Sequence, residues 1–172
     1  MRSRYEALLS LVLIGLLPVN QATASTSAAT LANGLPDSHL TPGALNPAVT
    51  QATIGSTICV AGWTKTVRPK ASYTNALKRQ QLSSGYNLGG DLDLRNYEED
   101  HLVPLEIGGA PSDPKNLWPE PRHIARGASF KDKLENKLHL MICGGLISLK
   151  TARAVFQTNW EVGYQKYIGP LN

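Results

Sequence analysis

The segment Tyr97–Gly109, with Asn116–Pro119 a few residues later, is the part of this 172-residue chain that best indicates its fold. An aspartate and a histidine, Asp100 and His101, stand side by side in it, and a proline and a glycine pair follow them. Proline and glycine at such spacing favour a turn between two strands. A histidine can accept a proton from water near neutral pH, and a neighbouring carboxylate can hold a divalent cation. The segment therefore predicts a turn that carries a general base beside a metal ligand.

The pattern Asp-His-x-x-Pro-Leu-x-x-Gly-Gly, followed by a short loop and Asn-Leu, resembles the motif of the HNH endonucleases, also called the ββα-metal or His-Me finger. The resemblance covers roughly residues 97–139 and implies a β-hairpin, a following helix and a metal ion held between them. It also implies that His101 is the general base, Asp100 a metal ligand and Asn116 the loop residue that orients the histidine. The wider pattern from Thr41 to the C-terminus is similar to small exported bacterial proteins that carry this motif.

The end of the motif departs from the family pattern. A third signature residue, histidine or asparagine, normally follows the middle asparagine closely, and here only His123 stands in that window. It follows Pro119 and Pro121, and prolines disfavour a helix at this place. The last metal ligand therefore has to be sought further along the chain.

The segment Gly127–Cys143 has apolar residues at a helical period of three to four. Asp132, Asn136 and His139 share one face of this helix, and Glu135 and His139 are four residues apart. We expect Asn136 or His139 to be the helix ligand, with Asp132 and Glu135 as further candidates. The alternative is an ordinary solvated face with ion pairs along the helix.

Several basic side chains are candidates for contact with a phosphate. Lys131 in the helix, or an arginine that precedes the motif, could neutralise a phosphate oxygen. A solvated basic surface is the alternative for the cluster before the motif, which consists of Lys65, Arg68, Lys70, Lys78 and Arg79.

The N-terminus has the pattern of a secretory signal peptide. Arg2 and Arg4 precede an apolar run over residues 7–17, and Ala22 and Ala24 are the small residues before a cleavage site. The run is too short for a stable transmembrane span. We therefore expect cleavage after Ala24 and a soluble, monomeric, secreted or periplasmic protein.

Cys59 and Cys143 are the two cysteines of the chain. In an oxidising compartment they are expected to form one disulfide that closes a loop of 84 residues, worth roughly 4 kcal/mol in the chain-entropy model. Zinc binding by the cysteines and two histidines is the alternative, although the usual Cys-x-x-Cys spacing is absent.

The expected architecture is a small α+β domain with an HNH-like finger, flanking helices and one disulfide. Residues 1–24 are the expected signal peptide, 25–55 an extended or flexible lead-in, and 56–172 the nuclease-like domain. The expected elements outside the finger are a strand at Thr57–Val60, a helix at Tyr73–Leu82 and a helix at Leu149–Trp160 with Ser148 as its N-cap.

Without Arg2, Arg4 and Glu6, the counts of 17 basic and 13 acidic residues fall to 15 and 12, a net charge of +3. This balance is compatible with DNA or RNA as substrate but does not select it. The resemblance implies hydrolysis of phosphodiester bonds with one divalent ion, Mg²⁺ or else Mn²⁺, Zn²⁺ or Ni²⁺. Two alternatives remain: a non-catalytic secreted binding module that retains the finger, and a domain in which the ion is purely structural.

Overall fold

The computed structural model describes residues 31, 35–124 and 126–171, so the expected signal peptide lies outside the described part. This part forms a small α+β domain with four α-helices and one two-stranded antiparallel sheet. The helices and strands in chain order are α2 (Trp63–Val67), α3 (Ala71–Ser83), β1 (Tyr97–His101), β2 (Leu117–Pro121), α4 (Ala128–Cys143) and α5 (Leu149–Tyr167). Short 3-10 helices lie at η1 (Ile54–Ser56), η2 (Leu94–Asn96) and η3 (Leu105–Ile107).

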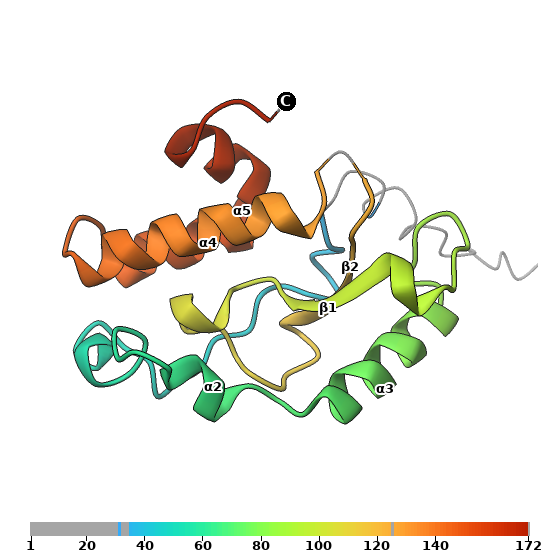
Figure 1. Ribbon diagram of the computed structural model, residues 1–172, viewed down its shortest axis with the longest axis horizontal. Coiled ribbons are helices and arrows are strands. Elements are labelled where there is room, and N and C mark those ends of the chain that lie inside the picture. Colours follow the sequence, from blue (N-terminus) through green and yellow to red (C-terminus); the bar gives the residue numbers. More distant parts are fainter. Residues whose placement is uncertain (1–30, 32–34, 125, 172) are drawn as a thin grey trace, which may run out of the picture.

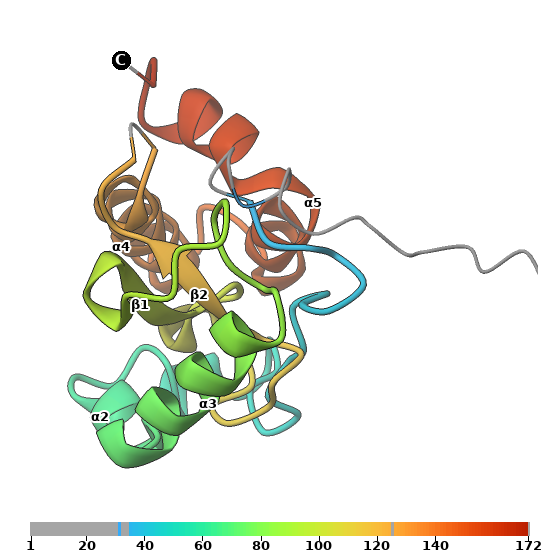
Figure 2. The same ribbon diagram turned by 90° about the vertical axis from the view of Figure 1, so that its right-hand side faces the viewer.

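The hairpin of β1 and β2 lies in the middle of the molecule. Helices α4 and α5 cover one side of it, and α3 and α2 lie on the other side (Figures 1 and 2). Antiparallel pairing places Glu98 opposite Glu120, Asp100 opposite Trp118 and His101 opposite Leu117. The hairpin therefore connects two helical layers.

Helix α4 follows the apolar period expected of it. Its buried positions, Ala128, Lys131, Leu134, Leu138 and Ile142, recur every three or four residues and form one face. The helix ends at a glycine pair, where the backbone N–H of Gly144 donates to the carbonyl of Leu140 over 2.9 Å. The expected helix and its glycine-rich end are confirmed.

Helix α5 begins as expected but continues past Trp160. Ser148 is its N-cap and accepts a hydrogen bond from the backbone N–H of Thr151 at 3.1 Å. At Asn159 the backbone leaves the helical conformation, and the Asn159 Oδ1 atom accepts from the N–H of Glu161 at 2.9 Å. Asn159 therefore caps a second helical stretch, which carries the buried Trp160 and Tyr164 into the core.

Before the hairpin, one expected element is confirmed and one is wrong. The helix expected at Tyr73–Leu82 is present as α3. The strand expected at Thr57–Val60 is a series of turns, in which the N–H of Cys59 donates to the carbonyl of Ile54 over 3.0 Å. Its apolar residues indicated burial, and Ile58 is 2 % exposed, but no neighbouring strand lies beside it in the described sheet.

Residues 35–53, within the expected lead-in, are irregular and packed against the domain. The N–H of Gly43 donates to the carbonyl of Lys115 over 2.9 Å, and the N–H of Ala110 donates to the carbonyl of Ala44 over 2.9 Å. Val49 lies in the core. This segment therefore supports the loop between β1 and β2.

The disulfide expected from sequence is present between Cys59 and Cys143, with a Cα–Cα distance of 5.6 Å. It joins the turns before α2 to the end of α4. Within the described residues, no helix combines the length and apolar character that crossing a membrane requires.

Candidate functional site

The two faces of β1 carry different chemistry. Successive side chains of a strand point to opposite faces, and paired residues of an antiparallel sheet point to the same face. Glu98 and Asp100 therefore share a face with Glu120 of β2, toward α4. His101 leaves the strand on the other face, next to the loop that joins the two strands. Asp100 and His101 thus point to opposite faces at the end of β1.

Lys131 occupies the centre of the face between the hairpin and α4. It is 0 % exposed, and its Nζ atom forms ion pairs with Asp100 and with Glu135, one turn further along α4. The Glu120 Oε2 atom lies 3.9 Å from the same nitrogen. Three carboxylates therefore surround one buried ammonium group.

Burial and mutual repulsion set the protonation of this carboxylate group. Burial opposes ionisation of Asp100, but the nearby Lys131 outweighs it and lowers the Asp100 pKa to about 2. Burial raises the pKa of Glu120 and of Glu135, and the charge of Asp100 raises both further. Neither oxygen of Glu120 accepts a hydrogen bond from the described residues. Glu120 and Glu135 are therefore favoured in their protonated forms, and Asp100 is the member of the group that is held ionised beside Lys131.

His101 is held as a neutral imidazole with one nitrogen available. The ring is 4 % exposed, and its Nε2 atom lies 2.8 Å from the carbonyl oxygen of Pro111. A carbonyl oxygen only accepts, so Nε2 carries the hydrogen and Nδ1 keeps its lone pair. Burial lowers the pKa of His101, and the charge of Asp100 offsets this in part. His101 can therefore accept a proton at Nδ1 near neutral pH.

Asn116 acts on His101 through the loop and not by direct contact. Its side chain is fully buried, accepts from the N–H of Val103 at 2.9 Å, and donates to the carbonyls of Val103 and Ala110 at 3.0 Å each. These bonds close the loop whose Pro111 carbonyl holds the histidine. Asn116 therefore stabilises the loop that contacts His101.

The two preferred helix ligands do not lie with Asp100. The Asn136 side chain is on the exposed face of α4 and donates to the carbonyl of Asp132, itself exposed, over 2.8 Å. His139 lies about two turns beyond Lys131, where its Nε2 atom is 2.8 Å from the carbonyl oxygen of Ile58. Of the sequence candidates on α4, the structure brings Lys131 and Glu135 to Asp100.

Two acidic residues of the site were not singled out from sequence. Glu120 stands two residues after Trp118, the strand partner of Asp100, so the hairpin register would have placed Glu120 on the face of Asp100. Glu106 in η3 lies with its Oε2 atom 3.7 Å from the Nδ1 atom of His139. No periodic signal marked Glu106, because it lies in a 3-10 turn whose direction depends on packing.

Of the basic residues before the motif, Lys78 does not belong to an exposed surface, whereas Lys65, Arg68, Lys70 and Arg79 are exposed. Lys78 is buried and donates to the carbonyls of Leu94 and Tyr97 at 3.0 Å each, so it supports the hairpin. Arg68 is exposed just after α2, and its charge contributes to lowering the pKa of His101. Arg68 is therefore the basic side chain of this set that lies within electrostatic reach of His101.

A second group of metal-capable side chains lies at the far end of α4. Ligand atoms of Cys59, His139 and Cys143 all lie within 4.8 Å of one another, so this group could hold a metal ion. Both sulfur atoms are at present joined in the disulfide.

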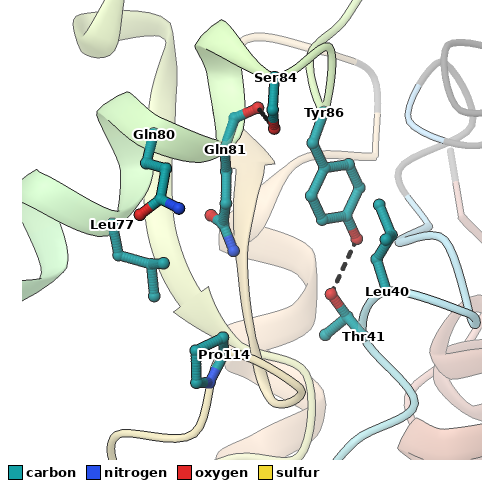
Figure 3. Close-up of a pocket in the computed structure, with 8 residues that line it drawn as sticks. All are labelled: Leu40, Thr41, Leu77, Gln80, Gln81, Ser84, Tyr86 and Pro114. Atoms are coloured by element: carbon teal, nitrogen blue, oxygen red, sulfur yellow. Dashed lines mark hydrogen bonds between the residues drawn. The ribbon is translucent and has the colours of Figure 1, made fainter.

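A pocket of about 260 Å³ lies between α3 and the segment around Leu40 and Thr41 (Figure 3). The hydroxyl groups of Tyr86 and Thr41 are 3.0 Å apart at its side. Its lining contains no carboxylate, histidine or cysteine, so it offers no acid–base pair comparable to the hairpin.

No family model, curated protein or solved structure matches the chain. The function is therefore argued from the geometry of the site.

Proposed function

We propose that this protein is a metal-dependent nuclease that hydrolyses phosphodiester bonds, and that β1, β2 and α4 form a finger of the HNH type. The observation that carries this proposal is the His101 imidazole at the end of β1. Its Nε2 atom is occupied by the Pro111 carbonyl at 2.8 Å, and its Nδ1 atom is left as the base. Asp100, whose pKa is lowered to about 2, is the preceding residue and lies on the other face of the same strand.

The residues around Lys131 have the oxygen ligands that a hard divalent ion prefers, although among the described residues only Cys59, His139 and Cys143 bring three ligand atoms within 4.8 Å of one another. Asp100, Glu120 and Glu135 offer carboxylate oxygens, which Mg²⁺ and Mn²⁺ prefer. Glu120 has oxygens without a hydrogen-bond donor, which an ion could use. When bound, such an ion supplies positive charge that stabilises a phosphate under attack. The Lys131 ammonium lies among the same oxygens, so the ion has to displace it in order to bind.

The chain's own groups account for the proton transfer. The Nδ1 atom of His101 takes a proton from water while the water oxygen forms a bond to phosphorus. The phosphorus bond to the leaving oxygen breaks, and that oxygen takes a proton from solvent. Arg68, whose charge reaches His101, would balance charge on a neighbouring phosphate. DNA or RNA without strong sequence preference is the proposed substrate, since a single small domain has little room for reading bases.

Secretion after signal cleavage and a monomeric state are part of the same proposal. The disulfide between Cys59 and Cys143 is consistent with an oxidising location.

A second candidate function is a non-catalytic binding module that retains the finger as a scaffold. Lys131 favours it, because a fully buried ammonium already balances the carboxylates and leaves no need for a metal ion in folding. The two candidates differ in whether His101 is needed for any chemistry.

The test is cleavage of plasmid DNA and of RNA by the disulfide-bonded protein with Mg²⁺, Mn²⁺ or chelator. The wild type is compared with His101→Ala and with His123→Ala, an exposed histidine outside the site. Ion-dependent cutting that only His101→Ala abolishes supports the nuclease. A folded wild type that cuts neither substrate with either ion supports the binding module.

A further inference from the structure

Four side chains of different chemistry converge where α4 ends. His139 and Cys143 come from α4, Cys59 from the turns before α2, and Glu106 from η3. Ligand atoms of the two cysteines and the histidine lie within 4.8 Å of one another, and the Glu106 Oε2 atom lies 3.7 Å from the His139 Nδ1 atom. This group is separate from the oxygen-only group around Lys131.

His139 is oriented as a metal ligand would be. Its Nε2 atom is 2.8 Å from the carbonyl oxygen of Ile58, so Nε2 carries the hydrogen and Nδ1 is unprotonated in the neutral ring. Histidines that bind metals almost always donate their other ring N–H to a carbonyl or carboxylate, which fixes the ring. The Ile58 carbonyl supplies that partner, and Ile58 is the chain neighbour of Cys59.

The donor set matches zinc. Two thiolates, one imidazole nitrogen and one carboxylate oxygen are ligands that Zn²⁺ takes in four-coordinate sites. With Zn–S bonds of about 2.3 Å and Zn–N bonds of about 2.0 Å, ligand atoms of one tetrahedral ion lie roughly 3.3 to 3.8 Å apart. The ligand atoms of Cys59, His139 and Cys143 all lie within 4.8 Å of one another, so adjustments of their side chains bring them to the spacing that one ion requires once the sulfur atoms are no longer bonded to each other.

We propose that reduction of the Cys59–Cys143 disulfide converts this group into a zinc site with His139 Nδ1 and Glu106 as the other ligands. A thiol or phosphine reductant supplies two electrons, the S–S bond breaks, and each sulfur takes a proton. Zinc binding then releases those two protons to solvent. The ion would hold the turns before α2 to the end of α4, the same connection that the disulfide makes in the oxidised protein. This inference does not depend on nuclease activity.

Both the reductant and the ion have access to the group. Cys143 is exposed, and Cys59 and His139 are partly buried. The surrounding fold does not rely on the cysteines alone, because the face of α4 that contains Leu134, Leu138 and Ile142 is buried in the core.

The experiment uses Co²⁺ as a spectroscopic substitute for Zn²⁺. The protein is reduced with a phosphine, which is oxidised to the phosphine oxide with an oxygen atom from water, and is then titrated with Co²⁺ under anaerobic conditions. The expected result is one equivalent of cobalt bound with thiolate charge-transfer absorption and the visible bands of a tetrahedral ion. Zn²⁺ should displace it. The oxidised protein should show neither signal.

Variants distinguish a built site from chance binding by thiols. His139→Ala and Glu106→Gln should each weaken the cobalt affinity of the reduced protein by about tenfold or more, as loss of a ligand or its partner does. His123→Ala, an exposed histidine elsewhere, should leave the affinity unchanged. Equal affinity in wild type and His139→Ala would overturn the proposal, as would reduced protein that takes up no cobalt.

Reduction could unfold the chain, so the melting temperature of the reduced protein is measured with and without Zn²⁺. A rise with Zn²⁺ in wild type, absent in His139→Ala, supports the site even when the metal-free reduced chain is unfolded. A reduced wild type whose folding and melting do not respond to Zn²⁺ overturns it.

Discussion

The Nε2 atom of His101 lies 2.8 Å from the carbonyl oxygen of Pro111, which belongs to the loop between β1 and β2. This contact decides which nitrogen of the ring is free. The loop therefore sets the position of the proposed base. A substitution that distorts the loop should lower the proposed activity although His101 itself is unchanged.

Gly109→Ala should disrupt this loop. A Cβ atom at Gly109 would stand 1.8 Å from the Val103 carbonyl oxygen and 2.6 Å from the Asn116 Nδ2 atom. We expect a loss of at least about 2 kcal/mol in the free energy of unfolding, because the backbone has to move. Gly55→Ala is the matched control, since nothing lies within 4 Å of its added Cβ. Urea unfolding of both variants measures this, and equal midpoints would contradict the described loop.

The two asparagines of the expected site should behave differently. Asn116→Ala leaves the buried N–H of Val103 and two carbonyls without partners, which costs roughly 2 to 3 kcal/mol. Asn136→Ala removes one exposed bond to the Asp132 carbonyl and should change stability by no more than about 0.5 kcal/mol. Thermal and urea unfolding of the two variants gives the comparison. A Mn²⁺ affinity lowered in Asn136→Ala would show that the helix ligand is Asn136 after all.

Glu99 should make the protein less stable as pH rises. Burial raises the pKa of Glu99 to about 8, whereas the unfolded side chain titrates near 4.5. Between these values the unfolded state has released a proton that the folded state keeps, so the free energy of unfolding falls with increasing pH and levels off above about pH 8. Glu120 and Glu135 shift in the same direction, so part of the slope belongs to them.

The Glu99→Gln variant isolates the contribution of that side chain. Urea midpoints of both proteins are measured in chelator from pH 5 to pH 8. The variant should show a shallower decline than wild type. Parallel curves would mean that Glu99 is ionised in the folded protein.

Replacing Lys131 should open the carboxylate group to ions. Lys131→Met keeps the length of the side chain and removes the ammonium that Asp100 and Glu135 bind. We expect Mn²⁺ to bind at least about tenfold more tightly by calorimetry, a change of about 1.4 kcal/mol. Lys137→Met, an exposed position on the same helix, should leave the affinity unchanged. Adding Glu135→Gln to Lys131→Met should reverse the gain.

The wild type provides a second test of the Lys131 prediction when Lys131→Met does not fold. Its buried amine should resist acetylation in chelator and become labelled at saturating Mn²⁺, with exposed Lys150 as internal reference. Labelling that does not respond to Mn²⁺ would show that the ion does not displace the ammonium.

The pattern of the chain determined the local structure of α4 and of the start of α5. The apolar period of α4, the glycine pair after it and the Ser148 cap of α5 each depend on residues within a few positions, so sequence was sufficient. The disulfide also followed from composition, because the chain has two cysteines, which allow one pairing, and an oxidising compartment was expected. The residue spacing alone did not decide which helix side chains would meet Asp100.

Only the tertiary structure decided the membership of the site. The rotation and height of α4 against the hairpin bring Lys131 and Glu135 to Asp100, and they leave Asn136 in solvent and His139 beside Ile58. Glu135 and His139 are one turn apart on the same side of α4 and have the same periodic signal, so only packing against other elements distinguishes them. The sequence therefore determined that this helix has a metal-capable face, and the fold determined which of its residues face the hairpin.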